Sequence, residues 1–238
     1  MRIDILSIFP DKIKDFLEFS ILERALNKNL FEIYYHDIRD YTEDKHCRVD
    51  DTPYGGGGGM ILSADPIYNA YLSITENFDE KPYVIFLNPS GNLYNQEKCK
   101  SLSKKKNLML ICGRYEGFDQ RIIDFIGDEE ISIGDYVITG GEIAACVIAD
   151  SVIRLLPGVL SSENSYVNES HFSILLEHPQ YTKPSTWQNI DVPEVLLSGD
   201  HKKVDLWKKE QSIERTKNRR PDLYDKYVQK ANQNKTEY

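Results

Sequence analysis

Three stretches in the middle of the chain each join a short apolar run to a turn that contains glycine. They read YVIFLNPSGN (residues 83–92), LMLICGRYEG (residues 108–117) and EISIGDYVITGGE (residues 130–142). Such apolar runs predict strands over residues 83–87, 108–112 and 130–133. A helical pattern follows each of them, at residues 94–102, 118–125 and 142–155. Short strands that alternate with helices predict an α/β fold with a mainly parallel sheet.

The three glycine turns are expected to lie side by side. The carboxyl ends of parallel strands meet at one edge of the sheet, where α/β proteins bind their ligands. One such turn alone would only end a strand. Three in succession, two of them with tyrosines and acids beside the glycines, favour a nucleotide-like ligand, because glycine lets the backbone approach it closely. The chain has no P-loop motif, and its first strand ends in IFP (residues 8–10) without a dinucleotide-binding fingerprint.

The N-terminal part predicts two further strands, at residues 2–9 and 31–36, and a weak helix at residues 64–74. Between the strands, SILERALNK (residues 20–28) has helical spacing, with Ser20 as the expected N-cap and Glu23 completing a capping box. Residues 40–60 are polar and rich in glycine, which predicts a long loop. Its five consecutive glycines form either a flexible segment or one that passes close to a bulky partner.

Composition excludes several classes of protein. The chain has 238 residues, of which 40% are hydrophobic and 28% charged, which suits a folded core. The longest apolar run, residues 143–149, is much shorter than the roughly 20 residues of a membrane helix. The N-terminus MRIDILSIFP lacks a cleavage site, so we expect no signal peptide. Four widely spaced cysteines are expected to be reduced thiols of a cytoplasmic protein.

The charge is unevenly distributed. The formal net charge is −9, but residues 201–238 contain 11 Lys and Arg against 6 Asp and Glu, so they carry +5. This basic end can contact a polyanion, although a solvated helical surface would explain the same composition. Helical patterns at residues 202–215 and 221–230 predict a small helical domain over residues 173–238. It would follow an α/β domain over residues 1–157 and an aperiodic, polar linker over residues 158–172.

Six segments, in order along the chain, carry a family resemblance. They read DIRDYTEDKHCRVDDTPYGGGGGM, LICGRYEGFDQRIID, SIGDYVITGGE, DSVIRLLPGVL, HPQYTKP and VPEVLLSGDH. The chain resembles the bacterial tRNA (guanine-N1)-methyltransferases, which are SPOUT-class enzymes. The resemblance implies a mainly parallel sheet with a deep trefoil knot built from the three glycine turns, plus a small all-helical C-terminal domain. It also implies a cytoplasmic homodimer with its active site at the subunit interface.

The resemblance further implies S-adenosylmethionine as methyl donor and the anticodon stem-loop of tRNA as partner, with no membrane involvement. The methyl group would go to N1 of the guanine immediately 3′ of the anticodon. The cofactor site would comprise Leu87, Asn88, Pro89, Gly113, Tyr115, Glu116, Ile133, Gly134, Tyr136, Gly140 and Gly141. The substrate site would comprise His46, Asp50, Tyr54, Gly55, Arg114, Ser170, Lys208, Arg215, Arg219 and Arg220. No spacing indicates a metal site, so magnesium would be an accessory ion.

The chemistry of the target explains which catalytic groups are needed. Guanine N1 carries a proton at neutral pH, so a base must remove it while charge on O6 is stabilised. By the resemblance, Glu169 would be the base, where the family has an aspartate, and Arg154 would stabilise O6. Glu116 would be a second acid near the guanine and the methyl donor.

Alternatives to these assignments stay open. His171 is a rival base, and Arg154 could form a structural ion pair with Glu142, Asp150 or an acid of a partner chain. The function could be that of a SPOUT enzyme with another RNA target. It could also be that of a non-catalytic module that binds RNA or senses a ligand. The non-catalytic alternative gains weight from glutamate at position 169 and from the all-glycine run, where the family commonly has a proline before the final glycine.

Overall fold

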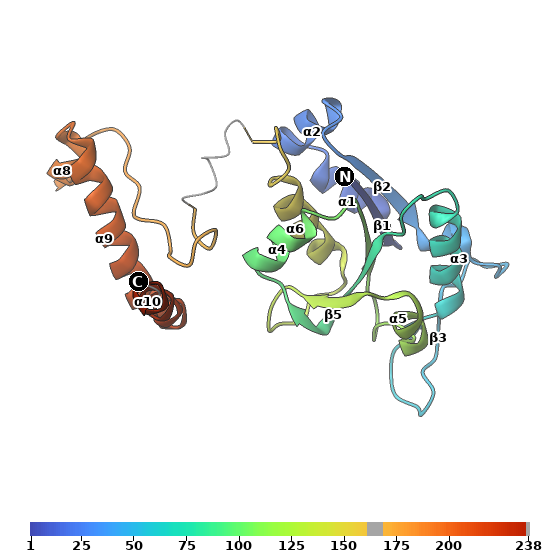
Figure 1. Ribbon diagram of the computed structural model, residues 1–238. Coiled ribbons are helices and arrows are strands. Elements are labelled where there is room, and N and C mark those ends of the chain that lie inside the picture. Colours follow the sequence, from blue (N-terminus) through green and yellow to red (C-terminus); the bar gives the residue numbers. More distant parts are fainter. Residues whose placement is uncertain (161–168, 237–238) are drawn as a thin grey trace. The chain divides into compact units, whose positions relative to one another are not determined.

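The computed structural model describes residues 1–160 and 169–236 and divides into two compact units, Met1–Ser161 and Ser162–Tyr238. In the first unit, five strands form one sheet in the order β2-β1-β6-β5-β7 (Figure 1). They are β1 (Arg2–Ser7), β2 (Glu32–Asp37), β5 (Tyr83–Leu93), β6 (Asn107–Cys112) and β7 (Glu129–Ser132). All neighbouring strands are parallel, so the predicted α/β sheet is confirmed.

Alternating side chains of the strands fill two cores, one on each face of the sheet. Ile5, Ile85 and Leu110 lie in the first core, and their chain neighbours Leu6 and Phe86 lie in the second. The first core is covered by α1 (Pro10–Leu17), α2 (Ser20–Asn27), α4 (Gln96–Leu102) and α6 (Glu142–Ile153). The second is covered by α3 (Ala64–Thr75), α5 (Gln120–Ile126) and the 3₁₀ helix η1 (Ile38–Tyr41). Both faces of the sheet are therefore buried, as a parallel sheet requires.

Strand β5 differs from its prediction. The sequence indicates a turn at residues 88–92, but β5 continues to Leu93. Leu87 and Asn92 both align with Ile131 of β7, so the residues between them bulge out of the ladder. Because β7 offers a second stretch of pairing beyond the bulge, turn-forming residues are accommodated inside a strand. The bulge brings Asn88 and Pro89 to the carboxyl edge of the sheet.

Glycine is required where the chain segments meet at this edge. A Cβ atom at Gly91 would lie 2.5 Å from the backbone carbon of Glu130 and the backbone nitrogen of Ile131. A Cβ at Gly113 would lie 2.8 Å from the carbonyl oxygen of Leu87, and one at Gly141 2.7 Å from the nitrogen of Gly113. Backbone therefore packs directly on backbone at the ends of β5, β6 and β7. The trefoil knot stays a prediction.

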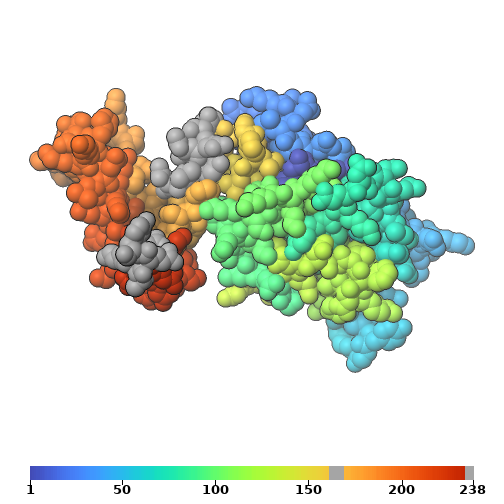
Figure 2. All heavy atoms as spheres, viewed as in Figure 1, coloured from blue at the N-terminus to red at the C-terminus, as the bar shows by residue number. Residues whose placement is uncertain are grey.

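One N-terminal prediction is wrong and another is refined. Ser20 does not cap α2: it is the first helical residue, has a φ of +56°, and follows an N-cap position, Phe19, without a side-chain cap hydrogen bond. The predicted loop over residues 40–60 contains ordered elements, because β3 (Asp50–Asp51) pairs antiparallel with β4 (Ile61–Leu62). This hairpin carries the glycine run at its tip, and Figure 2 shows the connecting segment as a light-blue projection at the lower right.

The cysteines fall into two groups. All four are free; Cys47 is exposed, whereas Cys99, Cys112 and Cys146 are buried. Burial, with the nearby Glu142 carboxylate, raises the pKa of Cys146 to about 11. The buried thiols are therefore protonated at neutral pH.

The second unit is mainly helical, as predicted. The expected helices become α9 (His201–Arg219) and α10 (Pro221–Thr236), preceded by a short α8 (Glu194–Leu197). Contrary to what the resemblance implied, the unit is not all-helical, because β8 (Thr186–Trp187) and β9 (Ile190–Asp191) form a hairpin. Its turn residues Gln188 and Asn189 have φ values of +48° and +61°, and the pair lacks the glycine that normally marks such a turn. The linker predicted over residues 158–172 lies largely outside the described residues.

None of the described helices combines the length and apolar character needed to cross a membrane.

The crowding at Gly91 predicts a specific loss of stability. We expect Gly91→Ala to lower the free energy of unfolding by about 1–3 kcal/mol, since the added methyl group displaces the backbone of β7. Gly58→Ala is the matched control, because its Cβ would meet nothing within 4 Å and its φ lies outside the left-handed range. The control should leave stability unchanged or raise it by less than about 1 kcal/mol. Urea unfolding measures the stability of both variants. Equal stabilities would contradict the close contact between Gly91 and the backbone of β7.

Candidate functional site

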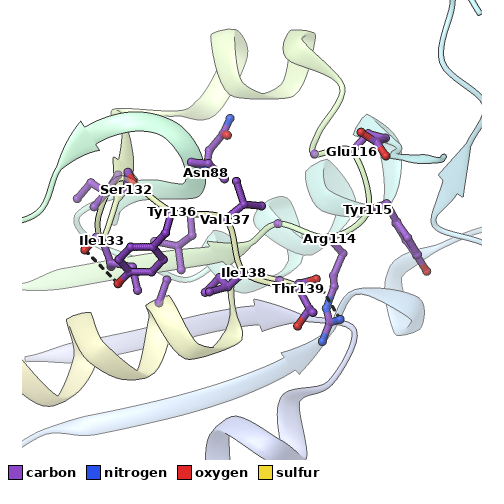
Figure 3. Close-up of a pocket in the computed structure, with 18 residues that line it drawn as sticks. Asn88, Arg114, Tyr115, Glu116, Ser132, Ile133, Tyr136, Val137, Ile138 and Thr139 are labelled. Atoms are coloured by element: carbon purple, nitrogen blue, oxygen red, sulfur yellow. Dashed lines mark hydrogen bonds between the residues drawn. The ribbon is translucent and has the colours of Figure 1, made fainter. Parts of the chain in front are cut away.

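The bulge of β5 and the carboxyl ends of β6 and β7 enclose one pocket (Figure 3). The three segments predicted to contain glycine turns therefore share a cavity, although the first is a bulge within β5 and its Gly91 does not line the pocket. All residues expected at the cofactor site line it, except Gly134. They are Leu87, Asn88, Pro89, Gly113, Tyr115, Glu116, Ile133, Tyr136, Gly140 and Gly141. The lining also includes residues that were not predicted to belong to a site, namely Gly117, Ile131, Ser132, Val137, Ile138, Thr139 and Ala144.

Gly134 has a different role from the one expected. A Cβ atom there would collide with the ring of Tyr136, which lines the pocket. The Tyr136 hydroxyl donates to the carbonyl oxygen of Ile133 at 3.4 Å, a contact drawn in Figure 3. Gly134 therefore permits the tyrosine ring to fold back over the turn without itself lining the pocket.

Arg114, expected at the substrate site, lies in the pocket wall. Its Nε donates to both carboxylate oxygens of Glu142 at 3.1 Å, and its Nη1 donates to the carbonyl oxygen of Thr139 at 3.3 Å. Glu142 also accepts a hydrogen bond from the Ser7 hydroxyl at 2.7 Å. A Cβ at Gly140 would collide with both partners of the ion pair, so Gly140 leaves the space in which they meet.

Glu116 connects the pocket to the glycine run. Its amide donates to the carbonyl oxygen of Met60 at 2.9 Å, and a Cβ at Gly59 would lie 2.5 Å from Oε1 of Glu116. Tyr115, one residue before it, has a φ of +57°, a costly conformation for a tyrosine. The β3–β4 hairpin is thereby attached to the pocket rim through this turn.

The expected substrate residues of this hairpin region lie in different settings. Tyr54 is completely exposed and adjoins Gly55, whose φ is +87°. Asp50 is in β3, opposite Leu62. His46 lies in an exposed turn, where its amide donates to Asp44 Oδ1 at 2.8 Å.

The same turn contains the ion pair between Arg48 and Asp44. Hydrogen bonding from the Arg48 side chain, together with the His46 amide, lowers the pKa of the Asp44 carboxyl. The turn therefore keeps its carboxylate ionised.

Arg154 lies at the opposite end of α6 from the pocket. Gly141, the N-cap of α6, lines the pocket, whereas Arg154 is the C-cap. The 12 residues of the helix span about 18 Å, so Arg154 is far from the pocket of its own chain. Asp150 lies one helical turn before Arg154, whose amide donates to its carbonyl oxygen at 3.0 Å; burial raises the pKa of the Asp150 carboxyl, and the charge of Arg154 opposes that rise. Glu142, the other acid considered, is bonded to Arg114 instead.

In the second unit, Glu169 begins a turn that a hydrogen bond closes, from the amide of Phe172 to its carbonyl oxygen at 3.3 Å. His171, the rival base, lies in this turn with a φ of +70°. Ser170 accepts a hydrogen bond from the Glu177 amide at 2.9 Å. The turn therefore holds both candidate bases.

The expected RNA-binding residues of α9 share one side of the helix. Lys208, Arg215 and Arg219 are spaced by seven and four residues, so they project from the same face. Arg215 donates to the carbonyl oxygen of Glu177 at 3.2 Å. Arg220, just beyond the helix, pairs with Asp222 at 2.7 Å on the surface.

The described residues contain no group of three or more His, Cys, Asp or Glu side chains able to hold a metal ion.

Comparison with known proteins gives consistent matches over nearly the whole chain. The family model described as tRNA (Guanine-1)-methyltransferase TrmD matches residues 1–226. A tRNA (guanine-N(1)-)-methyltransferase of Ruminiclostridium cellulolyticum is 50% identical over 230 residues, 97% of this chain and 99% of the relative. The proteins of the same description from Clostridioides difficile and Bacillus pumilus are 49% and 47% identical, over 97% and 94% of this chain and 100% and 92% of the relatives.

Proposed function

This chain belongs to the tRNA (guanine-1)-methyltransferase family, and on that premise we propose how its residues carry out methyl transfer. It is an enzyme that methylates N1 of guanine in tRNA, and the family uses S-adenosylmethionine. Its parallel α/β sheet agrees with the SPOUT fold of the family. These matches favour catalysis over a non-catalytic module, and tRNA over other RNA targets.

We propose that S-adenosylmethionine binds in the pocket between the bulge of β5 and the ends of β6 and β7. Gly113, Gly140 and Gly141 expose bare backbone in its wall, and Leu87 and Ile138 provide apolar surface suited to a purine. The bound cofactor supplies an electrophilic methyl group on its sulfonium. This pocket, formed by three turns distant in sequence, is the observation that carries the proposal.

The catalytic groups would act on the guanine ring. Glu169 would accept the N1 proton, and the guanidinium of Arg154 would stabilise the negative charge that develops on O6. Glu116 lines the pocket and would lie beside the reacting base. The target base must leave its stack to be reached, as for other enzymes that modify bases.

The place of Arg154 supports a homodimer with a shared active site. Ile143 and Val147, one turn apart on α6, are 60% and 42% exposed, although the rest of this helix is almost entirely buried. An apolar stripe on such a helix favours burial against another protein surface. Two copies of α6 packed antiparallel about a two-fold axis would bring Arg154 of each protomer toward the pocket of its partner.

The remaining expected residues would hold the tRNA. Lys208, Arg215 and Arg219 present a line of positive charge suited to the phosphates of the anticodon stem, with Arg220 at its end. Tyr54 is free to stack on an unpaired base. His46, Asp50, Gly55, Arg114 and Ser170 complete the proposed substrate contacts.

The target nucleotide, the cellular location and the role of magnesium are part of the proposal. The guanine 3′ of the anticodon is the proposed target, and the cytoplasm is the proposed location because the substrate is a tRNA. Magnesium would be accessory, and no proposed step depends on it.

Unmodified transcripts test the target. We expect methyl transfer to a tRNA with guanine 3′ of the anticodon and none to the same tRNA with adenine there, since only guanine offers an N1 proton to remove. Mass spectrometry of nuclease digests locates the methyl group. A product on another guanine would contradict the proposed position.

Removing the base should separate chemistry from binding. We expect Glu169→Gln to lower the single-turnover rate by about 10²–10⁴-fold, because an amide does not accept the proton. The affinity for S-adenosylmethionine, measured by calorimetry, should stay the same. His171→Ala is the control and should keep its activity. If His171→Ala removes activity and Glu169→Gln does not, the base is His171.

Mixed dimers test whether Arg154 acts across the interface. Ala144 is buried and lines the pocket, so Ala144→Phe should block the cofactor site. Neither Arg154→Ala nor Ala144→Phe homodimers should be active. Their equal mixture should recover about a quarter of wild-type activity, because about half of the dimers are mixed and each contains one intact site. No recovery in verified mixed dimers would mean that Arg154 acts within its own chain.

A further inference from the structure

The pocket wall contains a buried ion pair with no part in the chemistry proposed above. The Glu142 side chain is 10% exposed, and both its oxygens accept hydrogen bonds from Nε of Arg114 at 3.1 Å. Oε1 also accepts from Ser7 Oγ at 2.7 Å. These contacts join the end of β1, the turn after β6 and the start of α6.

Arg114 is held on three sides. Its Nε is fixed by Glu142, its Nη1 donates to the carbonyl oxygen of Thr139, and its guanidinium carbon lies 4.7 Å from the centroid of the Phe9 ring. Phe9 is itself placed by Ser7, whose hydroxyl oxygen accepts from the Phe9 amide at 2.9 Å. Within the described parts of the chain, Nη2 donates to no other residue. The fixed guanidinium therefore keeps one donor edge available at the pocket rim.

The Arg114 side chain lies on one side of the pocket. In Figure 3, Arg114 runs beside Thr139, across the pocket from Asn88 and Ser132. A buried carboxylate is unfavourable unless it is paired and hydrogen-bonded, and here each partner belongs to the pocket wall or its support. The arrangement therefore fixes the orientation of Arg114.

We propose that Glu142, supported by Ser7, is a positioning residue that fixes the Arg114 guanidinium to receive an oxygen acceptor of the tRNA. This inference rests on the proposed function, in which Arg114 contacts tRNA. A rigid guanidinium edge suits guanine or phosphate oxygens and loses little rotamer freedom on binding. We call the contacts of Ser7 and Glu142 that fix Arg114 the clamp. Loss of the clamp should impair the use of tRNA and leave the binding of S-adenosylmethionine unchanged.

Glu142→Gln tests this with almost no change of shape, because glutamine keeps an acceptor for Ser7 but loses the charge that pairs with Arg114. We expect kcat/KM for tRNA to fall at least tenfold, with the Kd for S-adenosylmethionine within twofold of wild type. Glu129→Gln is the matched control: its side chain is 8% exposed, bonds Lys98 and Tyr83, and lies outside the pocket lining. It should leave kcat/KM unchanged.

A double-mutant cycle distinguishes positioning from a structural role. If Glu142 acts through Arg114, Glu142→Gln should add nothing to the loss already caused by Arg114→Ala. Additive losses, or an equal loss of cofactor and tRNA affinity, would overturn the clamp. Should Glu142→Gln not fold, Ser7→Ala replaces it in the same cycle, with a smaller expected loss.

The cycle also separates this inference from the proposed function. Wild-type tRNA kinetics in Arg114→Ala would overturn both the clamp and the tRNA contact of Arg114, while leaving the roles of Glu169 and Arg154 intact. If Arg114→Ala lowers kcat/KM for tRNA and Glu142→Gln lowers it further in the double variant, the clamp alone would be overturned.

Discussion

The amide of Gly141 donates to the carbonyl oxygen of Gly113 across 2.7 Å, and the pocket depends on this contact. It holds the turn after β7 against the end of β6, while Gly113 itself lies against the carbonyl oxygen of Leu87. No side chain separates these segments, so their spacing is set by covalent geometry and hydrogen bonding. The pocket therefore has walls of backbone, and Asn88, Arg114 and Tyr136 take their places from that framework.

Sequence patterns predicted the local elements and the convergence of the three turns, because both follow from short-range periodicity and from the rule that parallel strands end at one edge. They did not predict the bulge in β5, since Asn88, Pro89 and Gly91 are turn-forming residues whose strand conformation depends on pairing with β7. Ser20 had the right spacing for a cap but has a left-handed φ. The intrinsic preference of a residue sets its backbone conformation only where contacts with distant segments do not override it.

The residues of the candidate site also fall into two groups, those with a local sequence signal and those that depend on contacts between distant segments. Glycines and tyrosines in the turns were detectable signals, and most of them line the pocket, with Gly91 and Gly134 as exceptions. Glu142 was recognised only as a possible partner of Arg154, because a sequence does not show that Ser7, from the first strand, meets the start of α6. Arg154 shows the opposite case. Its motif was visible in the sequence, but it ends α6 about 18 Å from Gly141, so its proposed role depends on the proposed homodimer.

The distribution of thiols has a practical consequence. Cys47 is exposed in the turn that holds His46, whereas the other three cysteines are buried and one of them has a pKa near 11. A maleimide dye would therefore attach to the unaltered sequence at a single position. The enzyme thus carries a natural attachment point for a fluorescent reporter, beside a residue proposed to touch RNA, and binding could be followed in real time without engineering the chain.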